Sequence, residues 1–160
     1  MLDLFIIKHE DQNQSTIGTK IDVFTDEIFA LGALSELMSA DEIQVKSVIN
    51  VVDGTSIEVS KPVFKDGKLS FECDYNGSIG EVEEGVYVMV YIEDDNYETS
   101  AFEEESEMKQ AFAENQRTPG RHFLSMFKVD IDAAVLMPIE IEIENFKYQF
   151  KPDLKKKGAK

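Results

Sequence analysis

The stretch VFKDGKLSFECDY, residues 63–75, decides the expected fold. Its Asp66-Gly67 dipeptide is favoured in tight β-hairpins, because both central residues of a type I′ turn need positive φ. After the turn, apolar and polar residues alternate from 69 to 75, which predicts a half-buried strand. Cys73 falls on the apolar side of this alternation, so we expect it to be a small buried residue.

Further strands follow along the chain. The segment 43–52 alternates in the same way, and Asp53-Gly54 and Asn76-Gly77 are also hairpin dipeptides. The run VYVMVYI at 86–92 is apolar on both faces, which is typical of a strand covered on both sides. We therefore expect residues 43–92 to form a meander of antiparallel strands.

The C-terminal strand pattern changes its parity. Isoleucines alternate with glutamates from 139 to 144, but the apolar set then moves by one position to Phe146, Tyr148 and Phe150. A β-bulge or a bend near Asn145 would produce such a shift. The parity of Phe150 predicts that it contacts the core.

Two segments have helical patterns. Thr25 is the expected N-cap of the first, whose predicted buried stripe consists of Ile28, Leu31, Leu34 and Met38. In the second segment Ser100 and Glu103 have the spacing of a capping box, followed by a thin apolar seam at Phe102, Met108, Ala111 and Phe112.

These elements predict an α+β fold in which β-structure predominates. The antiparallel sheet or sheets would form a sandwich or a partly open barrel that carries two helices. We find no internal repeat in the sequence. Residues 1–151 are expected to form a single acidic globular domain, and the Lys-rich residues 152–160 a flexible C-terminal tail.

Composition indicates a cytoplasmic location. One cysteine excludes an internal disulfide, so folding does not require an oxidising compartment. The N-terminal apolar run, residues 2–7, lacks the features of a signal peptide, and no stretch reaches the roughly 18 apolar residues of a membrane helix. We expect an intracellular protein without a membrane contact.

Charge is distributed unevenly. The net charge is −16, yet residues 147–160 hold six lysines and one aspartate. The rest of the chain would repel nucleic acid and anionic membranes and attract a basic protein. Nucleic acid is therefore an unlikely partner except through the Lys-rich tail.

An acidic belt occupies residues 81–114, which contain twelve carboxylates and one lysine, and eight of the carboxylates lie within residues 91–108. Charge runs commonly serve only as solvated surfaces. The alternative is a surface that binds a basic partner, and its candidate residues are Glu93, Asp94, Asp95, Glu98, Glu103, Glu104, Glu105 and Glu107.

A basic loop, NQRTPGRHF at 115–123, directly follows the acidic helix. It contains the two arginines of the chain, Arg117 and Arg121, and also His122. Because guanidinium groups bind carboxylates and phosphates with two hydrogen bonds, this loop is a weak candidate for an anion site. The competing interpretation is a clamp that folds back onto the carboxylates of the acidic helix.

Metal and catalytic patterns are weak. His9-Glu10-Asp11, the segment 93–98, and the pair Asp130 and Asp132 carry possible ligands, but none has the spacing of a known metal motif. No nucleotide-binding loop, CxxC motif or catalytic triad is recognisable. The sequence thus predicts no metal, no cofactor and no catalytic residue.

Three classes of function fit these features. The favoured class is a non-enzymatic acidic protein-binding module, such as an inhibitor, immunity or phage anti-defence protein that engages a basic nuclease or nucleic-acid-binding protein. The first alternative is a structural assembly component such as a phage virion protein, which would include homo-oligomers. The second is a small phosphodiester hydrolase that uses Arg117, Arg121 and His122. The sequence leaves enzymatic activity open and favours its absence.

Overall fold

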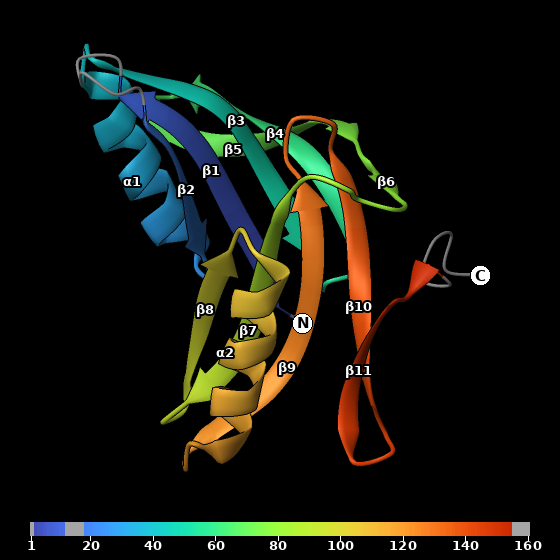
Figure 1. The fold of residues 1–160 in the computed structure, drawn as a ribbon. Helices are drawn as coiled ribbons and strands as arrows, with labels where there is room; N and C mark the ends of the chain where they lie inside the picture. Colours follow the sequence, from blue (N-terminus) through green and yellow to red (C-terminus); the bar gives the residue numbers. More distant parts are fainter. Residues whose placement is uncertain (1, 12–17, 155–160) are drawn as a thin grey trace.

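The computed structural model describes residues 2–11 and 18–154. These residues form eleven strands and two helices, arranged as two sheets with one helix packed on each (Figure 1). The predicted α+β class with predominant, antiparallel β-structure is confirmed.

The N-terminal sheet has the strand order β2-β1-β3-β4-β5, and all neighbours are antiparallel. Helix α1 (Glu27–Ser39) connects its second and third strands along the chain. The bounds of the strands are β1 (Asp3–Asp11), β2 (Gly18–Phe24), β3 (Ile43–Val52), β4 (Ser56–Lys65) and β5 (Lys68–Asn76).

The C-terminal sheet has the strand order β8-β7-β9-β10-β11, with antiparallel neighbours along this path. Helix α2 (Glu105–Arg117) connects β8 to β9, and the short strand β6 (Ser78–Ile79) pairs in parallel with β10. The other strands are β7 (Val86–Glu93), β8 (Asn96–Phe102), β9 (Arg121–Asp130), β10 (Val135–Glu144) and β11 (Lys147–Pro152).

The two sheets repeat one topology. Each consists of a hairpin, a helix of 13 residues and a three-stranded meander, joined in the same spatial order. One irregularity also matches: the register of the first strand with the third shifts between Lys8 and His9 in the first unit and between Val90 and Tyr91 in the second. The repeat escapes sequence inspection because the fold requires matching apolar patterns and not matching residues.

The core has three parts. The largest lies between the sheets and includes Leu4 and Ile49 from one sheet, and Val88 and Phe127 from the other. A second cluster packs α2 on the outer face of the C-terminal sheet, and a third packs α1 on the outer face of the N-terminal sheet. The layer order is therefore helix, sheet, sheet, helix, as expected for a sandwich covered on both sides.

Several local predictions are confirmed. The dipeptides at 53–54 and 66–67 both have positive φ at each residue and close hairpins. Strand β7 is covered on both faces, since Val88 and Val90 face the other sheet whereas Met89 faces α2. The seam of α2 is also as expected, with Met108 and Phe112 buried.

The predicted meander over 43–92 is wrong beyond Asn76. Strands β3, β4 and β5 form it, but the chain then crosses to the other sheet, where β7 lies. Asn76-Gly77 is not a hairpin turn. Gly77 is required there because a Cβ atom would collide with the Ala134 carbonyl oxygen and the Ile57 side chain.

The predicted start and buried stripe of the first helix need correction. Asp26, not Thr25, is the N-cap, and its carboxylate accepts a hydrogen bond of 2.8 Å from the Ile28 backbone N–H. The side chains of Ile28 and Met38 are exposed, whereas Ala30 and Leu34 are buried. Since apolar residues also occupy exposed positions of α1, its periodicity did not indicate which side faces the sheet.

The second helix begins later than predicted. Ser100 belongs to β8, where it pairs with Met89, so it cannot cap the helix. The capping box is formed by Glu104 and Glu107 instead. Sheet pairing extends the strand through the predicted cap, because tertiary context overrides local capping preferences.

Two expectations for the edge strands are also wrong. No bulge occurs at Asn145: it forms a hairpin turn with Phe146, with φ of 54° and 61°, and the parity changes because the chain reverses there. Cys73 is exposed, because burial along the edge strand β5 ends at Phe71.

The ordered chain extends past the expected domain end at Lys151. Pro152 is still paired with Ile139, and the Asp153 N–H donates to the Pro138 carbonyl at 2.7 Å. Leu154 packs against the core between the sheets. The rest of the predicted tail, 155–160, lies outside the described residues.

Candidate interaction surface

The acidic belt does not form one continuous surface. Glu93, Asp94 and Asp95 lie at the turn between β7 and β8, whereas the carboxylates at 103–107 lie at the start of α2. Strand β8 separates the two groups, and its seven residues span roughly 20 Å. Glu98 is exposed within this strand. The structure thus divides the predicted site residues between the two ends of β8.

A denser cluster of carboxylates forms at the start of α2. Tyr87 pairs with Phe102, so the residues that precede β7 lie beside those that follow β8. This pairing adds two exposed side chains, Glu83 and Glu84, that the sequence candidates did not include. We call the resulting set the glutamate patch; its members, all exposed, are Glu83, Glu84, Glu103, Glu104, Glu105 and Glu107.

Part of the glutamate patch serves the fold. The Glu104 N–H donates to the Glu107 carboxylate at 3.3 Å, and Glu105 pairs with Lys109 at 3.0 Å. Negative charge is also favourable at this end of the helix dipole. Within the described chain, no hydrogen bond or ion pair engages the carboxylates of Glu83, Glu84 or Glu103; these three are therefore available to another molecule.

Lys128 lies beside the patch but does not pair with its carboxylates. Its ammonium group is buried, donates to the Glu83 backbone carbonyl at 2.7 Å and lies 4.9 Å from the centre of the Tyr87 ring. This cation is thus used within the fold. It holds the loop before β7 in place through the Glu83 backbone, and the Glu83 side chain is exposed.

At the opposite end of β8, Glu93 is already paired. Its carboxylate accepts a hydrogen bond of 2.7 Å from Arg121, whose guanidinium also lies 5.3 Å from the centre of the Tyr91 ring. The hydrogen bond to Glu93 raises the pKa of the Arg121 guanidinium. Asp94 and Asp95 occupy the adjacent turn with positive φ and are exposed.

The basic loop is partly a clamp. Arg121 binds the strand residue Glu93, not the carboxylates of the acidic helix. His122 is exposed and follows Arg121 at the start of β9, and Arg117 is exposed at the end of α2. Arg121, His122 and Phe123 line a groove of about 430 Å³. The same groove is lined by Tyr148 and Gln116, so the polar groups at hand beside His122 are a phenol and an amide.

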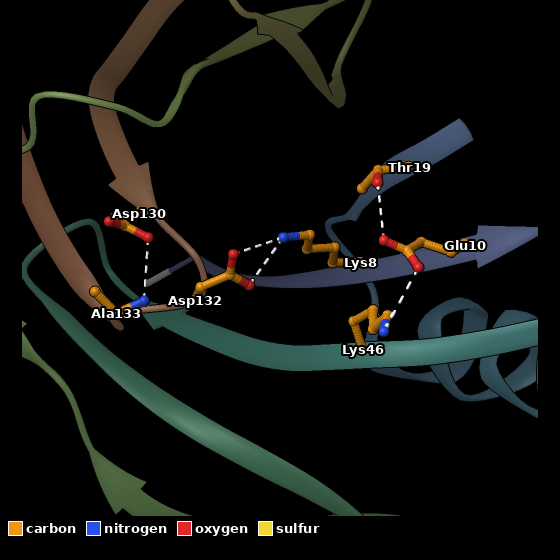
Figure 2. Close-up of polar contacts among 7 residues, drawn as sticks. All are labelled: Lys8, Glu10, Thr19, Lys46, Asp130, Asp132 and Ala133. Carbon is orange, nitrogen blue, oxygen red and sulfur yellow. Dashed lines mark hydrogen bonds and ion pairs between the residues drawn. The ribbon is translucent and has the colours of Figure 1, made fainter. Parts of the chain in front are cut away.

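The weak metal candidates are occupied by internal contacts (Figure 2). Both carboxylate oxygens of Asp132 accept hydrogen bonds from Lys8, at 2.8 and 2.7 Å. Asp130 accepts a hydrogen bond of 3.0 Å from the Ala133 N–H. The Lys8–Asp132 pair joins β1 to the loop after β9, so it links the two units of the sandwich.

The N-terminal candidates also have partners within the sheet. Glu10 accepts a hydrogen bond of 3.2 Å from Thr19 and pairs with Lys46 at 3.5 Å (Figure 2). His9 is buried, with its Nε2 atom 2.9 Å from the carboxylate of Asp22. Across residues 2–11 and 18–154, no three His, Cys, Asp or Glu side chains gather closely enough to hold a metal ion.

Comparison with known proteins adds no family: no protein-family model, curated protein or solved structure matches the chain. In the part of the chain that the structure describes, neither helix is long and apolar enough to cross a membrane.

Proposed function

We propose that the protein is a non-enzymatic binding module that engages a basic partner protein through the glutamate patch. The observation that carries this proposal is the pairing of Tyr87 with Phe102, which brings two separate segments with exposed carboxylates, 83–84 and 103–107, to the same end of β7 and β8. An inhibitor, immunity or phage anti-defence protein would use such a patch against the basic surface of a nuclease or another nucleic-acid-binding protein.

Electrostatics supports this use of the patch. Charges attract a partner over roughly 8–10 Å at physiological salt, which raises the association rate. The free carboxylates of Glu83, Glu84 and Glu103 lose no internal contact when they bind a lysine or an arginine. Glu105 would only have to exchange its exposed partner Lys109, an ion pair that contributes little to stability.

The test compares two variants with the same loss of charge. The first, Glu83→Gln, Glu84→Gln and Glu103→Gln, neutralises the free carboxylates of the patch. The control, Asp94→Asn, Asp95→Asn and Glu98→Gln, neutralises the part of the acidic belt at and beside the turn. Affinity for a basic protein co-purified from the source cell is then measured by calorimetry at two salt concentrations.

We expect the patch variant to bind at least about tenfold more weakly and the control to bind nearly as well as the wild type. The wild-type affinity should fall steeply as salt rises. Equal losses in both variants would assign binding to overall charge, and no loss in either would leave the patch as a solvated surface. Both results would reject the proposal.

A structural assembly role is the second candidate, favoured by the hairpin of β10 and β11. Its tip exposes Ile143 and Phe146, the latter completely, and its outer strand β11 is a sheet edge. Exposed apolar tips and edge strands are places where copies of a chain pair. Concentration-dependent assembly, measured by sedimentation and abolished by Phe146→Gly, would favour this role over the binding module.

A further inference from the structure

The N-terminal half of the outer side of α1 is apolar and uncovered, whereas its C-terminal half carries the exposed Ser35, Glu36 and Ser39. Ile28 is 77% exposed, Phe29 is 71% exposed and Met38 is 46% exposed. The inner side of the same helix is anchored by Ala30 and Leu34, which are fully buried. We call the exposed residues Ile28, Phe29, Gly32 and Met38 the α1 face.

Helix α2 is an internal reference for this surface. It has the same length and connects the same two strands in the repeated topology, so it faces the same requirements of the fold. At the positions equivalent to Ile28, Phe29 and Gly32, α2 carries Ser106, Glu107 and Gln110, which are polar and exposed. The fold therefore does not require apolar residues on the outer side of its helix.

Gly32 provides an independent observation. A Cβ atom at this position would meet nothing within 4 Å, so no internal contact requires glycine. Glycine destabilises a helix relative to alanine. Because Gly32 has no side chain, the helix surface is indented between Phe29 and the C-terminal half of α1. The backbone of another protein segment can approach α1 closely at this point.

The chain that carries the α1 face is acidic, and the two lysines beyond the C-terminal end of the helix, Lys46 and Lys61, are paired with Glu10 and Asp74. Residues 21–45 contain no lysine or arginine and six carboxylates: Asp22, Asp26, Glu27, Glu36, Asp41 and Glu42. A second copy of the chain would bring like charges together at this surface, and an anionic membrane would be repelled. The complementary partner has an apolar centre and basic flanks.

The α1 face continues into a groove at the C-terminal end of the helix. This groove has a volume of about 450 Å³, begins at Met38 and includes Val45, Pro62 and Tyr75. Apolar contacts spread over about two helical turns, followed by a groove, fit the apolar stripe of an amphipathic helix.

We propose that the α1 face binds an amphipathic, positively charged helical segment of a partner protein. Phe29 and Ile28 supply the apolar contacts, Gly32 permits close approach, and Asp26, Glu27 and Glu36 pair with flanking lysines or arginines. This inference is independent of the proposed function, because α1 and the glutamate patch lie on different sheets of the sandwich.

The experiment uses the full chain and a designed probe. The probe is a helical peptide of about 18 residues in which leucine and lysine are arranged to give one apolar and one basic face. A peptide with the same composition in scrambled order has the same charge but no apolar face. Binding of both is measured by fluorescence anisotropy at physiological salt.

We expect the amphipathic peptide to bind more tightly than the scrambled one, and the double variant Ile28→Ser and Phe29→Ser to lose at least about tenfold in affinity. Because both side chains are exposed, this variant should keep its circular dichroism spectrum. Gly32→Ala should raise the melting temperature and still weaken binding severalfold, a combination that a purely structural role of Gly32 would not produce.

Two controls locate the binding site. Phe146→Gly removes another fully exposed aromatic side chain and should leave peptide affinity unchanged. The glutamate patch variant should have only a slightly lower affinity for the peptide than the wild type. If the patch variant abolishes binding while the α1 variants do not, or if both peptides bind equally, the α1 face is not the site.

Two further outcomes would identify a different occupant. If the free protein forms dimers, and the double variant Ile28→Ser and Phe29→Ser dissociates them, the α1 face binds a second copy of the chain. Binding to neutral phosphatidylcholine vesicles, lost in the same variant, would assign it to lipid. Each result would overturn the proposal of a basic helical partner.

Discussion

The N-terminal and C-terminal units share one topology but differ in their helices. Toward its sheet, α1 presents Ala30 and Leu34, whereas α2 presents Met108, Phe112 and the polar Asn115. Toward solvent the difference is reversed, because α1 exposes Ile28, Phe29 and Met38 among its polar residues, whereas α2 exposes mainly polar and acidic side chains. Strand order and register therefore tolerate large changes in the residues of the helix. The residues on the outer surface of each helix can differ without loss of the fold, and they can be used for binding.

The turns of the two units differ in a similar way. The meander hairpin of the first unit turns at Asp66-Gly67, with φ of 53° and 75°. The equivalent hairpin of the second turns at Asn145-Phe146, with a bulky side chain in the left-handed region. Since both hairpins form, the sheet imposes the turn even where the local residue opposes it.

The largest expected effect concerns how each helix is anchored. Phe112 makes edge-to-face contacts with Phe123, Tyr148 and Phe150, with ring centroids 5.0, 4.9 and 5.6 Å away. We expect Phe112→Ala to lower the free energy of unfolding by about 4 kcal/mol, and the equivalent Leu34→Ala by about 3 kcal/mol. Urea unfolding measures both. A loss below about 1 kcal/mol for Phe112→Ala would show that α2 is not anchored by this cluster.

The second prediction exchanges one residue between the units. Asn115 is fully buried, and neither atom of its amide has a hydrogen-bond partner in the described structure; the equivalent residue of α1 is Leu37. We expect Asn115→Leu to raise the free energy of unfolding by about 2 kcal/mol, because an unpaired buried amide is costly. Thermal and urea unfolding measure the change.

A matched control keeps this result interpretable. Gln116→Leu changes the adjacent exposed position and should alter stability by less than about 0.5 kcal/mol. If Asn115→Leu destabilises the protein while the control does not, the amide is satisfied by an internal water or another molecule, and the position has a polar role that Leu37 lacks.

Sequence patterns predicted the parts of the fold that depend on local chemistry. Asp66-Gly67 and the doubly apolar β7 are examples, because positive φ and alternation are properties of the residues themselves. The start of α2 was misplaced since β8 extends through Ser100 only by pairing with β7. The side of α1 that faces the sheet was misassigned because its exposed positions also carry apolar residues, so the periodicity that would orient it is weak.

The candidate surface was predicted only in part for the same reason. The run of glutamates at 103–107 was visible in the sequence, but Glu83 and Glu84 join it only through the register of Tyr87 with Phe102. The alternation of apolar and polar residues in a strand does not indicate which strand it pairs with. The contact between Arg121 and Glu93 likewise depends on the pairing of β9 with β7 and not on the nearby acidic helix.

The third prediction tests the strained turn. Phe146 has a φ of 61° and a fully exposed side chain, whereas the equivalent residue of the first unit is Gly67. We expect Phe146→Gly to raise the free energy of unfolding by about 1 kcal/mol, because glycine adopts positive φ without steric cost. Gly67→Phe is the reciprocal variant and should destabilise by a similar amount. If Phe146→Gly lowers stability, the phenylalanine makes stabilising contacts that its exposure does not reveal.

The smallest effect on stability is expected at the edge strands β5 and β11. These strands have a phenylalanine at the equivalent position and differ in the residues after it. Phe71 in β5 and Phe150 in β11 both pack under the outer helices, but β11 ends at Pro152 whereas β5 continues through the exposed Cys73. Partial desolvation of the sulfur, followed by the negative charges of Glu58 and Asp74, raises the pKa of the Cys73 thiol.

A raised pKa means that less reactive thiolate is present at a given pH, so an exposed thiol should still react slowly near neutral pH. We expect the pH profile of iodoacetamide alkylation to have a higher midpoint for the native protein than for the same chain in urea. Glu58→Gln removes one of the two charges and should lower the native midpoint, whereas the distant Glu98→Gln should not move it. The expected effect on stability is negligible, because the thiol is exposed and uncharged under folding conditions.

A native midpoint at or below that of the unfolded chain would contradict this prediction. It would show that the carboxylates beside β5 do not act on Cys73, and that this edge is solvated as freely as an unfolded chain.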